Sequence, residues 1–329
     1  DDARLAWRSP ACVGALPRHL QETLTRRTLE LEIQTKPLGD NFGLEALDVD
    51  LATADGKTVD SVRELWRRDP VVLFRRQSLT DKELLAFSRN FGKLDVNIGG
   101  HAPNEFNPEL LYVSNLVRQD GVGVGGLGSN ELIWHTDQIY RDTPASGSIF
   151  YGAEMPEAAG RTSWCNMALA YESLPDDLRN RVEGRRAVCR YGTANPLSTF
   201  MAGNEQKTFR RDAKSAMDIS AIEARTPAVT HALVLENKSN GQCALYLSPN
   251  HTEAIEGLNE TEGRALIDAL LAHALRDDFI YTHEWRNGDV MLWDNARLLH
   301  RRDEFDARLP RLAKRTTIYM QPEYFAVPT

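Results

Sequence analysis

Two histidines and an aspartate in this sequence have the types and the spacing of a metal-binding set. One residue separates His135 from Asp137, and because side chains alternate faces along an extended strand, both could reach one ion. A second imidazole could come from His300, which follows a turn and a strand-like apolar run. Two imidazoles and a carboxylate on one face of a metal leave the opposite positions open. That arrangement is typical of non-haem Fe(II) oxygenases.

Two arginines beyond His300 predict a site for an anion near that metal. Arg311 and Arg315 are an even number of positions apart, so both could face the same interior if residues 312–320 form a strand. A buried guanidinium without a partner is costly, and its fork of donors matches a carboxylate at two points. A 2-oxo dicarboxylic acid would fit, since it chelates a metal at one end and offers its far carboxylate to an arginine.

Over roughly residues 29–320 the chain resembles the taurine/2,4-dichlorophenoxyacetate family of Fe(II)- and 2-oxoglutarate-dependent dioxygenases. The motifs that carry the resemblance are Asp69-Pro70-Val71-Val72-Leu73-Phe74-Arg75, Phe87-Ser88-Arg89-Asn90-Phe91-Gly92, the His135/Asp137 pair, Gly160-Arg161-Thr162-Ser163-Trp164, Trp293-Asp294-Asn295 and the spacing from His300 to Arg311. The resemblance implies an oxidoreductase that uses Fe(II), 2-oxoglutarate and O2 and releases succinate and CO2.

The resemblance also implies roles for individual residues. Iron binding falls to His135, Asp137 and His300, and binding of the far carboxylate of 2-oxoglutarate falls to Thr162 and Arg311. Many relatives have Gly-Gly-Asp before that threonine, whereas this chain has Ala159-Gly160-Arg161.

The same resemblance indicates a substrate that is a small or medium organic acid. Arg315 is expected to hold its anionic group, although this arginine could instead assist 2-oxoglutarate or pair with a structural acid. Asn97 stands where the taurine-type enzymes carry a histidine for the sulfonate, so taurine itself is not expected. Ile139, Tyr140 and Phe150 are apolar candidates that suit a substrate with an aromatic or alkyl body.

Several other functions remain open. Hydroxylation is favoured over halogenation, because related halogenases replace the carboxylate at the position of Asp137 with a small residue. Desaturation, cyclisation or C–N bond chemistry in a biosynthetic pathway would use the same cofactors. A more remote alternative is a jelly-roll protein that binds a metal and a small acid without catalysis. A zinc hydrolase would leave Arg311 unexplained.

Composition limits the class of protein. With 329 residues, of which 42% are hydrophobic, the chain can bury a large core. Its net charge of -8 argues against nucleic-acid binding. No run of about 18 apolar residues could span a membrane, and no secretory signal opens the sequence, so a cytoplasmic protein is expected. The four scattered cysteines, Cys12, Cys165, Cys189 and Cys243, are predicted to be free thiols. The composition also allows a homo-oligomer.

The elements that must position the candidate residues are predicted from periodicity and turn signals. Strands are expected at residues 29–33, 71–74, 146–153 and 312–320, and helices at 80–91, 167–183 and 262–275. Two strand pairs are expected, one joining 230–236 to 243–247 through Asn240-Gly241, the other joining 281–285 to 290–293 through Asn287-Gly288. Many short strands and few helices predict a mainly β fold with flanking helices, a double-stranded β-helix or jelly roll.

One catalytic domain is expected. Residues 1–28 are polar and basic and are predicted to form an N-terminal extension, and residues 29–329 the Fe(II)/2-oxoglutarate dioxygenase domain. The glycine-rich segment 121–128 lies just before the metal pair and is a candidate lid. The polar stretch 195–226 is either a second lid over the substrate or a solvated insertion.

Overall fold

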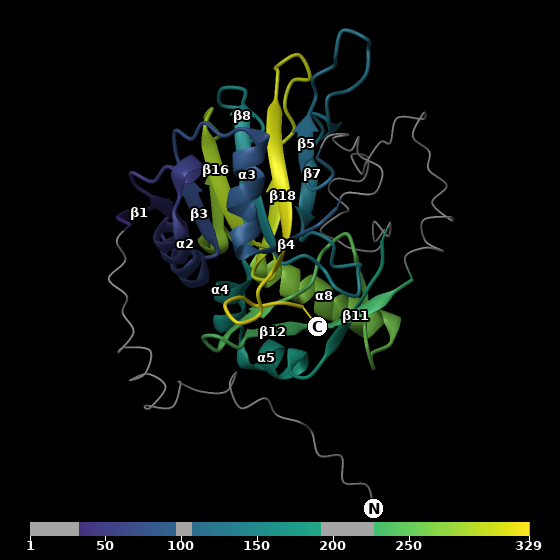
Figure 1. Cartoon of the computed structure of the whole chain (residues 1–329). Helices are drawn as coiled ribbons and strands as arrows, with labels where there is room; N and C mark the ends of the chain where they lie inside the picture. Colours follow the sequence, from purple (N-terminus) through teal and green to yellow (C-terminus); the bar gives the residue numbers. More distant parts are fainter. Residues whose placement is uncertain (1–32, 97–106, 192–226, 329) are drawn as a thin grey trace, which may run out of the picture.

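Two β-sheets stacked face to face form the centre of the molecule. The computed structural model describes residues 33–96, 107–191 and 227–328 (Figure 1). In order across the larger sheet lie β1 (Thr35–Pro37), β2 (Leu44–Ala46), β3 (Val71–Phe74), β16 (Asp289–Asp294), β8 (Gly147–Glu154), β18 (Leu312–Met320), β5 (Leu111–Ser114) and β6 (Gly126–Leu127), with β4 (Gly92–Leu94) also paired to β18. The smaller sheet has the order β15 (Ile280–His283), β9 (Thr162–Asn166), β17 (Leu298–Arg302) and β7 (Leu132–His135). One apolar cluster takes side chains from both sheets, including Phe150, Trp164 and Trp293.

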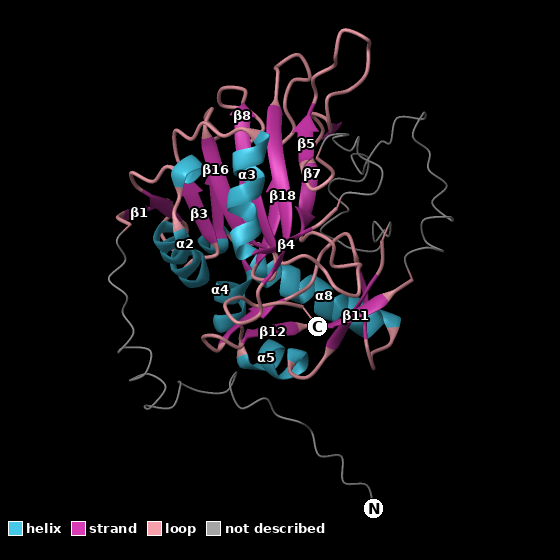
Figure 2. Cartoon of the chain, viewed as in Figure 1, coloured by secondary structure: helices cyan, strands magenta, loops and turns pink. Residues whose placement is uncertain are grey.

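The central strands of the larger sheet are apolar throughout because both of their faces are covered. Along β8, Ile149 packs toward the helical layer whereas Phe150 packs toward the smaller sheet. Alternate side chains therefore enter two different cores, and a continuous apolar run is what such a strand requires. The outer face carries α2 (Gly56–Arg68) and α3 (Asp81–Ser88) with the short helices η2 (Leu51–Thr53) and η3 (Arg89–Phe91), as Figure 2 shows for α3.

A third layer lies beyond one end of the sheets, in the lower part of Figure 1. Its helices are α4 (Met167–Glu172), α5 (Asp176–Val182) and α8 (Glu260–Ala274), with η5 (Asp277–Phe279). Its strands are β10 (Arg186–Cys189), β11 (Val229–Ala232), β12 (Val234–Asn237), β13 (Gln242–Leu245) and β14 (Thr252–Ile255). A separate apolar cluster fills this layer and includes Leu299 of β17, in the smaller sheet. The mainly β jelly roll with flanking helices is therefore confirmed.

Several predicted elements are confirmed by the structure. The strands at 71–74 and 312–320 are β3 and β18, and the strand at 146–153 is β8, shifted by one residue. The helix at 80–91 is α3 continued by η3, and its capping box is formed by Thr80 and Glu83. The predicted hairpin turn lies between β12 and β13, where Gly241 has a φ of 74°. The helix at 262–275 is α8, which begins two residues earlier.

Three predictions about elements are wrong. The helix at 167–183 is two helices, α4 and α5, because Pro175 lacks the amide hydrogen that a continuous helix needs. The strand at 230–236 is interrupted at Leu233, so β11 pairs with β10 instead of extending the hairpin. The strands at 281–285 and 290–293 do not pair, since β15 lies in the smaller sheet and β16 in the larger one. The chain does reverse at Asn287-Gly288, but in a jelly roll such a turn can connect a strand of one sheet to a strand of the other.

Some predictions fall on residues outside the described part of the chain, and the prediction that all four cysteines are free thiols is wrong for Cys243. Outside the described part of the chain lie the extension 1–28, residues 29–32 of the predicted first strand, Asn97 and the whole stretch 195–226. Cys165 and Cys189 are free thiols, as expected. Cys243 is in a disulfide bond, which the scattered spacing could not indicate because pairing depends on proximity in space. Within the described residues, no helix has the length and apolarity needed to cross a membrane.

Candidate metal centre

The two candidate histidines are direct neighbours across two antiparallel strands. In the pairing of β7 with β17, His300 lies opposite His135, so both side chains point to the same face. Their ring centroids are 4.2 Å apart. Asp137 follows the end of β7 instead of lying within it, and Gln138 turns the chain with a φ of 58°. One candidate ligand atom from each of the three residues lies within 4.8 Å of the others.

The hydrogen bonds of this group leave the ligand atoms available. His135 Nδ1 lies 2.6 Å from the carbonyl oxygen of Ile133, which can only accept, so Nδ1 carries the proton and Nε2 offers its lone pair. His300 Nε2 is 3.5 Å from Asp137 Oδ2, and His135 Nε2 is 3.9 Å from Oδ1. Two imidazole nitrogens and a carboxylate that converge in this way fit a divalent ion with open positions opposite them.

The charge state of the group also suits a cation. Burial alone would raise the pKa of Asp137, but Arg315 and the two histidines outweigh it and hold that pKa well below its usual range. Burial lowers the pKa of His135 and His300, and the second imidazole lowers that of His300 further. At neutral pH the set is therefore one carboxylate and two neutral imidazoles, which is the protonation state that a metal requires.

Arg315 contacts the carboxylate of the candidate metal ligand. Its Nη2 donates to Asp137 Oδ2 and, at 2.8 Å, to Ser148 Oγ, while Nη1 lies 3.3 Å from Asp137 Oδ1. Its Cζ lies 5.2 Å from the centroid of the Trp293 ring. Most of the donors of this arginine are thus used within the protein, in line with the alternative that it pairs with an acid of the structure.

Arg311, which directly precedes β18, is a buried arginine. Its side chain is 1% exposed, Nη1 donates to Gly160 O at 3.2 Å, and Nε has no partner. Among the described residues no acidic group pairs with it. Burial and the neighbouring Arg302 lower its pKa to about 9. Thr162 Oγ1 accepts from Trp285 Nε1 at 2.8 Å, so the threonine hydroxyl keeps its own hydrogen for an acceptor.

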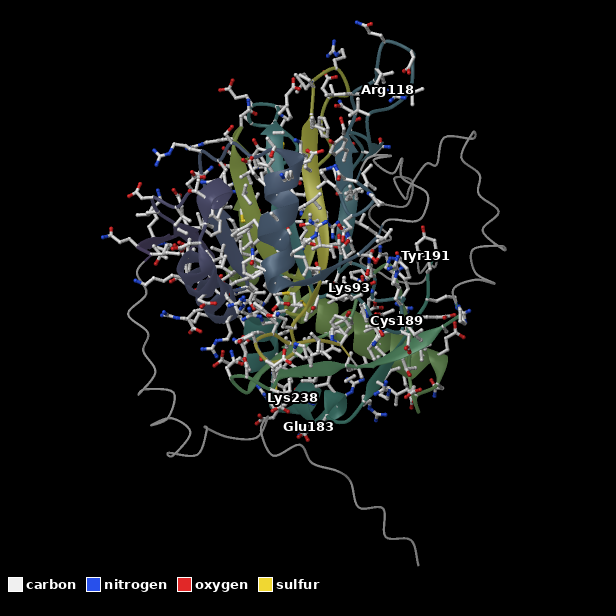
Figure 3. The ribbon with its side chains drawn as sticks, viewed as in Figure 1. Lys93, Arg118, Glu183, Cys189, Tyr191 and Lys238 are labelled. Atoms are coloured by element: carbon white, nitrogen blue, oxygen red, sulfur yellow. The ribbon has the colours of Figure 1, made fainter. Side chains whose placement is uncertain are left out.

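The apolar residues predicted to contact substrate differ in their surroundings. Ile139 is fully buried in the cluster of the third layer. Its 0% exposure leaves no surface for a ligand, so we do not retain it as a substrate contact. Tyr140 packs edge-on against Tyr191 and His251, with ring centroids 4.6 and 4.9 Å away. Figure 3 shows Tyr191 beyond Cys189, where the chain leaves β10.

Sequence reasoning missed several residues that shape the site. Ser148, on β8, and Trp285, in the segment between β15 and β16, hydrogen-bond to the candidate binding residues and are distant from them in sequence. Asp95 accepts from Gln138 Nε2 at 2.6 Å and from Arg141, which fixes the turn after the metal pair. Only Arg302 carried a usable signal, because it follows His300 by two positions on one strand and must share its face.

The glycine-rich segment forms a loop, as predicted, with one short strand inside it. β6 pairs with β5, and an isolated bridge joins Val117 to Gly123. Figure 3 shows Arg118 near the tip of this loop, beyond the ends of the sheet strands. The side that returns toward β7 lies beside Arg302, which donates to Leu127 O at 2.8 Å.

We expect the metal-free protein to lose stability as the pH falls below about 6.5. Burial lowers the pKa of His135 and His300, and it lowers the pKa of His251 to about 4 from its ordinary 6.5. Between the folded and unfolded values the unfolded chain binds more protons, so stability is present above 6.5 and lost as pH falls. Thermal unfolding with a chelator should show the midpoint falling by several degrees, since about 1 kcal/mol corresponds to about 2–4 °C. A midpoint that stays constant or rises would contradict this, and H251F should flatten the profile.

Comparison with known proteins places the chain in a family. A family model described as taurine catabolism dioxygenase TauD, TfdA family matches residues 34–317. The chain is 32% identical over 300 residues to alpha-ketoglutarate-dependent 2,4-dichlorophenoxyacetate dioxygenase from Cupriavidus pinatubonensis, covering 87% of this chain and 98% of the relative. It is 30% identical over 294 residues to pentalenolactone F synthase from Streptomyces avermitilis, covering 88% and 94%. A taurine dioxygenase structure from Burkholderia xenovorans matches with a TM-score of 0.69 at 30% identity, covering 90% and 94%. The chain belongs to the taurine catabolism dioxygenase TauD, TfdA family and is an Fe(II)- and 2-oxoglutarate-dependent dioxygenase.

Proposed function

We propose that this enzyme hydroxylates a small or medium organic acid at a centre held by His135, Asp137 and His300. The observation that carries the proposal is the buried Arg311, which has no acidic partner in the described part of the chain, on the same jelly roll as a convergent His-Asp-His set. Metal binding alone would explain the three ligands but not the arginine. A 2-oxo dicarboxylate accounts for both features, because it has a chelating end and a far carboxylate.

Each residue then has a defined task. His135 and His300 would bind Fe(II) through Nε2, and Asp137 through one carboxylate oxygen. Arg311 and the Thr162 hydroxyl would hold the far carboxylate of 2-oxoglutarate and fix the direction in which its other end points. When bound, Fe(II) with 2-oxoglutarate and O2 supplies the oxidant, with succinate and CO2 as co-products.

Arg315 would act first on the orientation of Asp137. Its two Nη atoms lie on the two carboxylate oxygens, an arrangement that keeps the carboxylate plane fixed and its charge negative. We retain the acid group of the substrate near Arg315 as part of the proposal. R315M tests this directly: a higher KM for the acid at unchanged 2-oxoglutarate affinity supports it, and the reverse pattern contradicts it.

A cluster of three aromatic side chains near the metal set indicates that the substrate carries an aromatic ring. Tyr140, Tyr191 and His251 pack together close to the metal set. Burial is the main cause that raises the pKa of Tyr140 to about 12, and the nearby carboxylate of Asp137 contributes to the rise. A neutral phenol and a neutral imidazole suit an aromatic ring. The 2,4-dichlorophenoxyacetate dioxygenase and the (S)-phenoxypropionate dioxygenase among the relatives are named for aryloxy acids, which supports an aromatic acid here.

The Y140A variant should raise KM about tenfold for an aryloxyacetic acid and much less for an alkanoic acid of similar length. The reason is that an aromatic contact contributes roughly 0.5–1.5 kcal/mol beyond the area that it buries. Tyr324 offers the matched control, since it is 42% exposed near the carboxyl end of the chain. Equal losses for both acids in Y140A, or a similar loss in Y324A, would show that the ring acts on the fold and not on the substrate.

One relative supports a different outcome of the same chemistry. Pentalenolactone F synthase is named as a biosynthetic enzyme, so desaturation or ring formation is the second candidate. Mass spectrometry of the product separates the two, because hydroxylation adds one oxygen atom and the alternative removes two hydrogen atoms.

Succinate release and O2 uptake with a panel of aryloxy and alkyl acids test the function. We expect turnover with Fe(II) and 2-oxoglutarate and none with Zn(II). Turnover with Zn(II) and without O2 would support a hydrolase, and binding of both ligands with no turnover on any acid would support the non-catalytic alternative. A cytoplasmic location and a homo-oligomer remain part of the proposal, and light scattering of the purified protein tests the second.

A further inference from the structure

Arg302 is a second buried arginine next to the proposed 2-oxoglutarate site. We propose that its guanidinium joins Arg311 in holding the far carboxylate, and that it sets the preference for 2-oxo dicarboxylates over 2-oxo monocarboxylates. The inference rests on the proposed function, because it assigns a further residue to the co-substrate site of that same reaction.

The sheet register places Arg302 beside the proposed carboxylate site. In the pairing of β17 with β9, Arg302 lies opposite Thr162, and His300 lies opposite Trp164. Partners in an antiparallel pair point to one face, and so do residues two apart on one strand. The side chain of Arg302 therefore emerges next to Thr162, on the face that carries the metal ligand His300.

The hydrogen bonds of Arg302 leave much of its guanidinium without a partner. The side chain is 3% exposed. Only Nη2 is satisfied, by the carbonyl oxygens of Leu127 and Asn130, whereas Nε and Nη1 are buried with no acceptor. No carboxylate in the described ranges pairs with this arginine. Unpaired donors on a buried cation are costly, so the site suits an acceptor that the described residues do not supply.

Both arginines lie against the same aromatic ring, and Arg302 is near enough to Arg311 to lower its pKa. The Cζ atoms of Arg302 and Arg311 lie 5.5 and 5.3 Å from the centroid of the Phe305 ring. Both guanidiniums are buried, and no carboxylate of the described residues pairs with either of them. One carboxylate can accept from both, since its two oxygens offer about four lone-pair sites. Arg311 Nε and Arg302 Nη1 are donors still free to meet it.

If Arg302 only stabilised the fold, its replacement would have a different effect. Arg302 also holds the backbone of the glycine-rich loop through Leu127 and Asn130. If that were its whole function, its loss would loosen the loop and weaken every 2-oxo acid alike. If it binds the far carboxylate, only acids that possess that group should suffer.

Calorimetric titration of the Mn(II)-loaded protein separates these roles without turnover. The two probes are 2-oxoglutarate and 2-oxopentanoate, which has the same chain but no far carboxylate. For R302M we expect the Kd of 2-oxoglutarate to rise about tenfold or more, while that of 2-oxopentanoate changes little. R302K keeps the charge but not the fork, and it should fall between wild type and R302M. The control is R301M, because the side chain of Arg301 is partly exposed and lies over the ring of Trp134 instead of beside Thr162.

The outcomes are distinct. Equal losses for both acids in R302M and R302K, or an unchanged Kd for 2-oxoglutarate in folded R302M, would overturn the inference and leave the proposed function intact. If R302M does not fold, the comparison of R302K with wild type decides in the same way. A wild-type protein that binds no 2-oxoglutarate would overturn the proposed function itself, and the inference with it.

Discussion

The D137A variant should lose metal binding and 2-oxoglutarate turnover together. Asp137 is the only carboxylate in the convergent set, and its charge is held negative by Arg315. Without it, two imidazoles remain beside an arginine that no longer has an acidic partner, and this uncompensated cation repels a divalent ion. We expect the affinity for Mn(II) to fall by more than the 10- to 100-fold that is typical of residues that only orient a ligand.

Equilibrium dialysis with Mn(II) and a succinate assay measure the two losses. Ser148 provides the matched control, because S148A removes another hydrogen-bond partner of Arg315 without touching a candidate ligand. Metal affinity that survives in D137A, or falls equally in S148A, would contradict the assignment of Asp137.

The R311M variant should separate co-substrate binding from metal binding. Truncating one partner of a buried charge pair costs about 2–5 kcal/mol, so the Kd of 2-oxoglutarate should rise about 30-fold or more, while Mn(II) affinity is retained. The ligand-free variant should be as stable as wild type or more stable, since methionine replaces a buried cation that no acidic group of residues 33–96, 107–191 or 227–328 neutralises.

Calorimetry and thermal unfolding of the same samples test both halves of this prediction. R308M is the control, because Arg308 lies three positions away and its side chain is 89% exposed. A lower unfolding temperature with unchanged 2-oxoglutarate affinity would mean that Arg311 serves the fold and binds no co-substrate.

The convergence of His135 and Asp137 with His300 could be predicted from the spacing of the first two and from the strand-like run before the third. Strand alternation holds for His135 and His300, which are paired on β7 and β17, whereas Asp137 lies just beyond the end of β7. The contact between Arg315 and Asp137 could not be predicted, since the even spacing of Arg311 and Arg315 gives a shared face but not a partner. The burial of Ile139 in an apolar cluster could not be predicted either. The left-handed turn at Gln138 redirects the chain, and an apolar residue after such a turn can enter a core as well as a pocket.

The fold was predictable at the level of element types and less so at the level of strand pairing. Runs such as Val71–Phe74 and Leu312–Met320 are strands because apolar residues fill both faces or alternate faces. The pairing of the strands depends on how the chain is distributed between the two stacked sheets. Contacts between residues far apart in the sequence determine that distribution. For that reason β15 and β16 lie in different sheets although a tight turn joins them.

We propose that one molecule of 2-oxoglutarate joins the metal set to Arg311. Titrating 2-oxoglutarate into the protein with Mn(II) and again with a chelator, and Mn(II) with and without 2-oxoglutarate, tests it most directly. If both ligands share one site, each must raise the affinity of the protein for the other by the same factor. We expect that factor to exceed about ten in the wild-type protein and to fall to about one in D137A. A 2-oxoglutarate affinity that does not change when the metal is removed would contradict the account.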